Sequence, residues 1–221
     1  MKLHIVMPSF RWWNLLTIKA NIEWAVRDLS KINWDILVFR DLYDNFPDFV
    51  LKKLKESWIN IIPVKNTPKG LDICYDKLNQ YAEMGPDIND RYYILCDDDM
   101  VLKDIDVLAE KMTSEVLIIS MKRGSFEKKR VFFRRVSHPI TTLIACPENM
   151  RIGYVGNGMY ILAGNVLKEN RFNAGSHVAD GEFIIKAAAK YRTEYAPDSY
   201  AVFNAYMDGR WDIKDISKEI K

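Results

Sequence analysis

The sequence lacks the features that mark membrane-spanning, secreted or zinc-thiolate proteins. No apolar run approaches the ~20 residues that a helix needs to cross a bilayer. The first residues lack the length and the small-residue cleavage site of a signal peptide. The three cysteines, Cys74, Cys96 and Cys146, lie far apart and show no Cys-x-x-Cys spacing. We therefore expect no transmembrane segment, a cytoplasmic location, and reduced, buried thiols.

Two common nucleotide-binding motifs are also missing. Gly153, Gly156 and Gly158 do not form Gly-x-Gly-x-x-Gly and do not follow a first strand, which argues against a dinucleotide-dependent oxidoreductase. No Gly-x-x-x-x-Gly-Lys-Ser/Thr is present, which argues against a P-loop NTPase.

The composition is that of an ordinary globular protein. The chain has 221 residues, of which 48% are hydrophobic and 28% charged, and its net charge of +2 is too small to indicate a polyanionic partner. We expect a single domain over residues 1–221. Within it we distinguish a first half at 1–102, a second half at 103–211 and a charged tail at 212–221.

Strand-like and helix-like segments alternate along the first half. The pattern predicts strands at 3–7, 34–39, 59–64 and 92–95 and helices at 15–29, from 47, and at 71–84. This alternation indicates an α/β fold with a mostly parallel sheet flanked by helices. For the second half we predict a mixed or antiparallel addition, with helices at 105–112 and 183–191 and strands at 116–120, 131–136, 140–146, 159–162 and 200–203.

Polar residues follow each predicted parallel strand. They are Pro8-Ser9, Arg40-Asp41, the segment 66–70 and the acidic triplet 97–99. Ligands of such sheets bind beyond the carboxyl ends of the strands. The four polar strand ends therefore predict a nucleotide-type pocket at one edge of the sheet.

The acidic triplet follows an apolar, aromatic strand directly. Asp97 and Asp99 are two residues apart on an extended chain, so both side chains point the same way and can hold one Mg²⁺ or Mn²⁺. Asp98 points the other way. The alternative is a solvated loop in which Asp104 or a neighbour caps the next helix.

Taken in order, four motifs of residues 3–102 resemble those of glycosyltransferases with the GT-A fold, in a family-2-like, non-processive form. The motifs are Met7-Pro8-Ser9-Phe10, Arg40-Asp41, Lys69-Gly70-Leu71 and Tyr93-Ile94-Leu95-Cys96-Asp97-Asp98-Asp99. The resemblance implies a nucleotide-diphosphate sugar donor, with a UDP-sugar as first choice. It implies Asp97 and Asp99 as ligands of Mn²⁺ or Mg²⁺, and donor-binding residues at Pro8, Ser9, Arg11, Asp41, Lys69, Asp97 and Asp98.

The second half resembles the acceptor side of the same enzymes. The matching segments are 155–160, which contains Asn157 and Gly158, and 179–183, with His177 just before it. A carboxylate here can take the proton of an acceptor hydroxyl. Asp180 is our first candidate for this base and Glu182 our second. The alternative is that Asp180 caps a helix and Glu182 favours its positive end.

Two departures from the family pattern limit the resemblance. Met207 replaces the glutamine of the Gln-x-x-Arg-Trp motif, which argues against a processive polysaccharide synthase. Asn204 stands near the place of a histidine that often completes the metal shell, so the third protein ligand stays open.

A basic stretch at 122–135 is interleaved with phenylalanines. It suits contact with phosphates and bases, and thus a DNA-base acceptor as well as a glycan, but it is also typical of a solvated hairpin. Two other functions stay open. One is a sugar-nucleotide nucleotidyltransferase; the other is a non-catalytic nucleic-acid-binding protein that uses this stretch.

Overall fold

The computed structural model describes residues 1–8, 12–43, 46–95, 100–124, 130–131, 134–135 and 141–204. Ser9, Arg11, the acidic triplet 97–99, half of the basic stretch and the residues after 204 lie outside this set.

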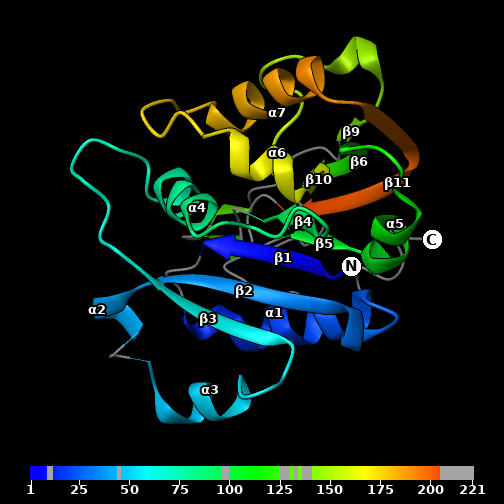
Figure 1. Cartoon of the computed structure of the whole chain (residues 1–221). Helices are drawn as coiled ribbons and strands as arrows, with labels where there is room; N and C mark the ends of the chain where they lie inside the picture. Colours follow the sequence, from blue (N-terminus) through cyan, green and yellow to red (C-terminus); the bar gives the residue numbers. More distant parts are fainter. Residues whose placement is uncertain are drawn as a thin grey trace.

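One mixed sheet forms the centre of the molecule (Figure 1). Its strands are β1 (Leu3–Pro8), β2 (Ile32–Phe39), β3 (Ile59–Val64), β4 (Arg91–Ile94), β5 (Met100–Leu102), β6 (Val116–Gly124), β9 (Thr141–Leu143), β10 (Tyr160–Ala163) and β11 (Thr193–Asn204). Their order is β3-β2-β1-β4-β10-β6-β11-β5, and β9 pairs with β6. A separate ribbon pairs β7 (Arg130–Val131) with β8 (Arg134–Arg135).

Helices cover both faces of the sheet. They are α1 (Trp12–Ala25), α2 (Arg40–Tyr43), α3 (Asp48–Lys53), α4 (Ile73–Glu83), α5 (Ile105–Lys111), α6 (Gly164–Glu169) and α7 (Ala179–Lys190). Helices α1 and α3 lie on one face, and α4, α6 and α7 lie on the other (Figure 1). The fold class expected from the sequence is therefore confirmed.

The directions of the strands place the ends of several strands at one edge of the sheet. Strands β1 to β4 run parallel, β10 runs antiparallel to both β4 and β6, and β6 and β11 are parallel to each other. The carboxyl ends of β1, β2, β3, β4 and β6 therefore share an edge with the start of β10. This is the edge at which the sequence predicts a pocket.

Three elements differ from the sequence prediction. The last strand begins at Thr193 rather than near 200, because it continues past Pro197 through a register shift between Ala196 and Tyr200. A proline normally interrupts strand pairing, which is why the pattern alone predicted a strand only after it, at 200–203. Helices α2 and α6 are too short for periodicity to reveal them.

The cysteines also differ from the prediction. Cys74 is disulfide-bonded rather than a reduced thiol. Cys146 is free but only half-buried. The cysteines therefore give no support to a reducing, cytoplasmic location. In the part of the chain that the structure describes, no helix combines the length and apolarity needed to cross a membrane.

A buried polar network ties three parallel strands to α4. On β1, His4 Nδ1 lies 2.6 Å from Oδ2 of Asp35 on β2, and Tyr81 of α4 donates to the same oxygen at 2.5 Å. Asn60 of β3 donates to Asp35 Oδ1 at 2.8 Å. His4 Nε2 lies 3.2 Å from Asp90 Oδ2. The side chain of Asp35 is therefore satisfied on both oxygens although it is only 2% exposed.

The pKa values of the network follow from these contacts. Burial alone would lower the pKa of His4, but hydrogen bonds and charges from Asp35 and Asp90 outweigh it, and the pKa is raised. Burial alone would raise the pKa of Asp35, but hydrogen bonds from His4, Tyr81 and Asn60 lower it. The structure thus favours a charged imidazolium beside a charged carboxylate.

This network predicts a pH-dependent loss of stability in the variant His4→Gln. A raised folded-state pKa means that the contribution of His4 is full below its unfolded value of about 6.5 and is lost as pH rises through the folded value. We expect wild type to exceed His4→Gln by about 1–2 kcal/mol in unfolding free energy at pH 6, and by less at pH 9. Urea denaturation at both pH values measures this. A difference independent of pH would contradict it.

Candidate functional site

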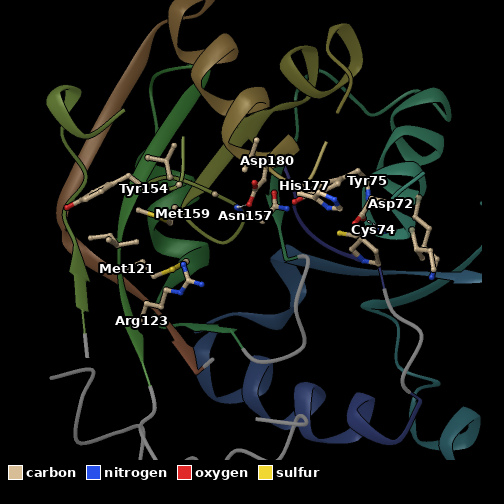
Figure 2. Close-up of a pocket in the computed structure, with 18 of the residues that line it drawn as sticks. Asp72, Cys74, Tyr75, Met121, Arg123, Tyr154, Asn157, Met159, His177 and Asp180 are labelled. Atoms are coloured by element: carbon tan, nitrogen blue, oxygen red, sulfur yellow. Dashed lines mark hydrogen bonds between the residues drawn. The ribbon is translucent and has the colours of Figure 1, made fainter. Parts of the chain in front are cut away.

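A cavity of about 670 Å³ opens at the carboxyl edge of the sheet (Figure 2). Its volume lies within the ~300–1,000 Å³ range of small-molecule sites. It is lined by Pro8 at the end of β1, residues 71–75 and Lys77 at the start of α4, Met121 and Arg123 of β6, Leu143 of β9, residues 153–157 and Met159 before β10, and His177, Val178 and Asp180 around the start of α7. Segments far apart in the sequence thus share one cavity.

Asp180 projects into this cavity from the first turn of α7. Its Oδ2 accepts a hydrogen bond from the backbone N–H of Asn157 at 3.2 Å, and its Oδ1 accepts one from the backbone N–H of Gly181 at 2.8 Å. The residue that precedes the helix is Val178, so Asp180 is not its N-cap. The positive end of the helix favours the negative charge at this place.

Gly156 makes room for this carboxylate. A Cβ atom on Gly156 would lie 2.5 Å from Asp180 Oδ2, closer than non-bonded atoms come. Any other residue at 156 would therefore push the Asp180 side chain away from the Asn157 amide. Glycine is required here for close approach rather than for its backbone angles.

The loop before β10 is fixed to the end of β4. The N–H of Gly158 donates to the carbonyl of Ile94 at 2.8 Å, and the hydroxyl of Tyr93 donates to the carbonyl of Gly158 at 3.0 Å. Gly158 has a φ of +79°, which suits glycine. The neighbouring Asn157 is buried, and its Oδ1 accepts a hydrogen bond from Tyr160. The backbone that holds Asp180 is thereby anchored to the strand that leads to the acidic triplet.

The two other acceptor-side candidates differ in position. His177 is exposed and lines the cavity. Glu182, the second candidate base, accepts hydrogen bonds from Ser176 Oγ at 3.1 Å and Asn173 Nδ2 at 3.2 Å, and it does not line the cavity. Its carboxylate is engaged with the loop before α7, whereas that of Asp180 faces the cavity.

Helix α4 forms the opposite wall. Asp72 caps it, accepting hydrogen bonds from the N–H groups of Cys74 and Tyr75. One turn further, Lys77 is 0% exposed, and its Nζ lies 4.1 Å from the ring centre of Phe39. Burial lowers the pKa of Lys77 to about 8, so its amine is mostly protonated at neutral pH. The sequence pattern predicted the buried face of α4, but it did not predict that Lys77 is buried there.

A second cavity of about 560 Å³ lies at the ends of β2 and β3, on the far part of α4. Asp41 lines it and accepts a hydrogen bond from Asn66 Nδ2 at 2.9 Å. Lys69 is exposed on the loop before α4 and lines neither cavity. Pro8 and Asp41, which the sequence assigns to one donor pocket, therefore border two cavities on either side of α4.

The predicted metal ligands Asp97 and Asp99, and the donor residues Ser9, Arg11 and Asp98, lie outside the described residues. Among those described, no group of three His, Cys, Asp or Glu side chains is placed to hold a metal ion. Asp72 and Lys77 are cavity residues that we did not assign to the site from the sequence, whereas Arg123 belongs to the basic stretch expected to contact phosphates. The sequence did contain a sign of the role of Asp72, because an aspartate just before an apolar helical pattern is a typical helix N-cap.

Solved structures resemble this chain, although no protein-family model and no curated protein matches it. S. aureus TarS 1–349 in complex with UDP matches 99% of this chain at 17% identity, with a TM-score of 0.63. The same protein in complex with UDP-GlcNAc matches 95% at 18% identity, with a TM-score of 0.57. The mannosyltransferase PcManGT from Pyrobaculum calidifontis, in complex with GDP-Man and Mn²⁺, matches 94% at 12% identity, with a TM-score of 0.57.

This chain spans 63%, 60% and 58% of those three chains. At these identities the likeness establishes architecture, and it extends over nearly all of the present sequence. The chain has the GT-A fold, as its strand-end motifs predict.

Proposed function

We propose that this protein transfers a sugar from a nucleotide-diphosphate donor to an acceptor hydroxyl. The observation that carries the proposal is the carboxylate of Asp180, which two backbone N–H groups hold at a cavity on the carboxyl edge of a GT-A sheet. Residues 1–102 supply most of the donor contacts and residues 103–211 most of the acceptor contacts, within one domain of 221 residues.

A UDP-sugar is our first choice of donor. Two of the structures that this chain resembles contain UDP or UDP-GlcNAc, and a third contains GDP-Man. The nucleoside lies near Asp41, and the diphosphate and sugar lie toward Pro8. Ser9, Arg11, Lys69 and Asp98 complete the donor contacts. Lys77 supplies positive charge for the diphosphate from inside the cavity wall.

Asp97 and Asp99 are the residues that would hold Mn²⁺ or Mg²⁺. Carboxylate oxygens suit these hard cations, and in the sequence both acids fall between β4 and β5. A bound cation would neutralise charge on the leaving diphosphate.

Asp180 acts as the general base. The acceptor oxygen attacks the anomeric carbon, the bond from that carbon to the diphosphate oxygen breaks, and the acceptor proton passes to Asp180. Asn157 and Gly158 position the carboxylate through the backbone, and His177 borders the acceptor. Glu182 orders the loop before α7 through Ser176 and Asn173 rather than taking the proton.

The first test is a thermal-shift and hydrolysis assay with nucleotide sugars and Mn²⁺. A bound donor should raise the melting temperature, and donor hydrolysis should fall at least about 100-fold on addition of EDTA or in Asp99→Ala. Asp48→Ala, which changes an exposed acid of α3, serves as the control. Hydrolysis indifferent both to chelation and to Asp99→Ala would sink the metal mechanism.

Two further assays distinguish this function from the two alternatives. A nucleotidyltransferase would release pyrophosphate from a nucleoside triphosphate and a sugar phosphate. A non-catalytic nucleic-acid-binding protein would bind DNA in a salt-dependent way and have no affinity for nucleotide sugars.

A second prediction concerns the position of the base. Asp180→Asn should lower the rate of transfer by about 100-fold or more with little change in UDP affinity. Gly156→Ala should also lower the rate of transfer, because the methyl group of the alanine displaces the Asp180 carboxylate. Gly175→Ala is the matched control, since its Cβ would meet only Asn173 Oδ1 at an ordinary 3.6 Å. Equal rates in the two alanine variants would show that the Asp180 position does not matter.

A third prediction concerns Lys77. Calorimetry should show UDP binding about tenfold weaker in Lys77→Met, whereas Lys186→Met on the exposed side of α7 should bind as wild type does. Because the pKa of Lys77 is about 8, its charge is lost between pH 7 and pH 9, so wild-type affinity should fall over that interval. Affinity in Lys77→Met should fall less. Parallel pH profiles would refute a role for this lysine in binding UDP.

A further inference from the structure

Three exposed apolar side chains line the main cavity. Leu71 is 41% exposed, Ile73 is 47% exposed and Val178 is 37% exposed, and all three line the cavity. Large apolar side chains normally appear singly on a protein surface, so a group at the mouth of a cavity indicates contact with a ligand. We call these three residues the apolar rim.

The apolar rim rests on a rigid base. The N–H of Asp72, between Leu71 and Ile73, donates to the carbonyl of Ala174 at 2.7 Å. The side chain of Asn79 exchanges two hydrogen bonds with the backbone of Phe172, at 2.8 and 2.9 Å. These contacts join the start of α4 to the loop before α7, so the two parts of the rim are held together.

Aromatic stacking lies beneath the same junction. The ring of Phe172 stacks on Tyr75 at 5.7 Å and on Phe183 at 4.1 Å, between ring centres. Tyr75 belongs to α4 and Phe183 to α7. The rim is therefore preorganised, and a ligand that covers it loses little free energy to ordering side chains.

The charges around the rim oppose an anionic ligand. Two acids, Asp72 and Asp180, line the cavity, and Arg123 lies on the far side of Asn157 from Asp72 (Figure 2). The other basic lining residue, Lys77, is buried in the wall, and in the function proposed above its charge is taken up by the diphosphate of the donor. A polyanion at the rim would face two carboxylates and apolar carbon, both of which disfavour it.

We propose, building on the function proposed above, that the acceptor carries an uncharged apolar group next to its reacting hydroxyl. An alkyl or aryl aglycone of a glycoside is of this class. The apolar group packs on Leu71, Ile73 and Val178 while the hydroxyl meets Asp180. Burial of the rim provides affinity, and Asp180 provides orientation and chemistry.

The test compares n-octyl and methyl β-D-glucoside, with octyl glucoside below its micelle concentration and with UDP and Mn²⁺ present. Saturation-transfer NMR or calorimetry should show the octyl compound binding at least about tenfold more tightly than the methyl compound. The variant Leu71→Asn/Ile73→Thr/Val178→Thr replaces each apolar side chain with a polar one of equal or slightly smaller size, and it should abolish this preference. Ile88→Thr removes an equally exposed apolar residue, 56% exposed, that does not line the cavity, and it should retain the preference.

The outcomes separate this inference from the function on which it rests. If UDP binds but octyl glucoside does not, or binds wild type and the triple variant equally, the apolar acceptor is refuted while the donor site stands. If a short single-stranded DNA binds more tightly than octyl glucoside and is unaffected by the triple variant, the acceptor is a polyanion instead. If UDP itself does not bind, the proposed function fails first. Unchanged UDP affinity in the triple variant shows that it is folded.

Discussion

The site depends on the close approach of three backbones: the end of β4, the loop before β10 and the first turn of α7. The amide of Gly158 binds the carbonyl of Ile94, and the amide of Asn157 binds the carboxylate of Asp180. Two glycines make this geometry possible, Gly158 through its positive φ and Gly156 through its missing Cβ. Strand β10 then enters the sheet antiparallel between β4 and β6, and this insertion aligns the acceptor side with the parallel half.

Helix α4 links the stability of the fold to the site. Its inner face carries Tyr81, which completes the network of His4 and Asp35 under the sheet. One turn earlier it carries Lys77, which lines the cavity, and Leu71 and Ile73 of the apolar rim lie at its start. A single helix thus packs on the parallel strands and forms one wall of both cavities. A movement of α4 would change both the cavity and the packing of the core.

The outcome for Asp180 and Glu182 shows where a local pattern stops being informative. Both acids lie in the first turn of one helix, and the sequence presents them as near equivalents. They differ in the structure because residues from other segments engage them: Asn157, 23 positions earlier, contacts Asp180, whereas Ser176 and Asn173 contact Glu182. Spacing on a helix defines the direction of a side chain, but the neighbouring segments decide what it meets.

The sequence alone determined the alternation of strands and helices and the polar strand ends, because both arise from local periodicity and from residues that end strands. Those features were sufficient for the GT-A fold class. Only the tertiary structure decided that Lys77 is a buried cation, that Cys74 is disulfide-bonded and that the last strand continues past Pro197. It also decided that Leu71, Ile73 and Val178 line one cavity. The physical reason is the same in each case: burial, pairing and shared surfaces are set by contacts between segments far apart in the chain, and local pattern does not contain that information.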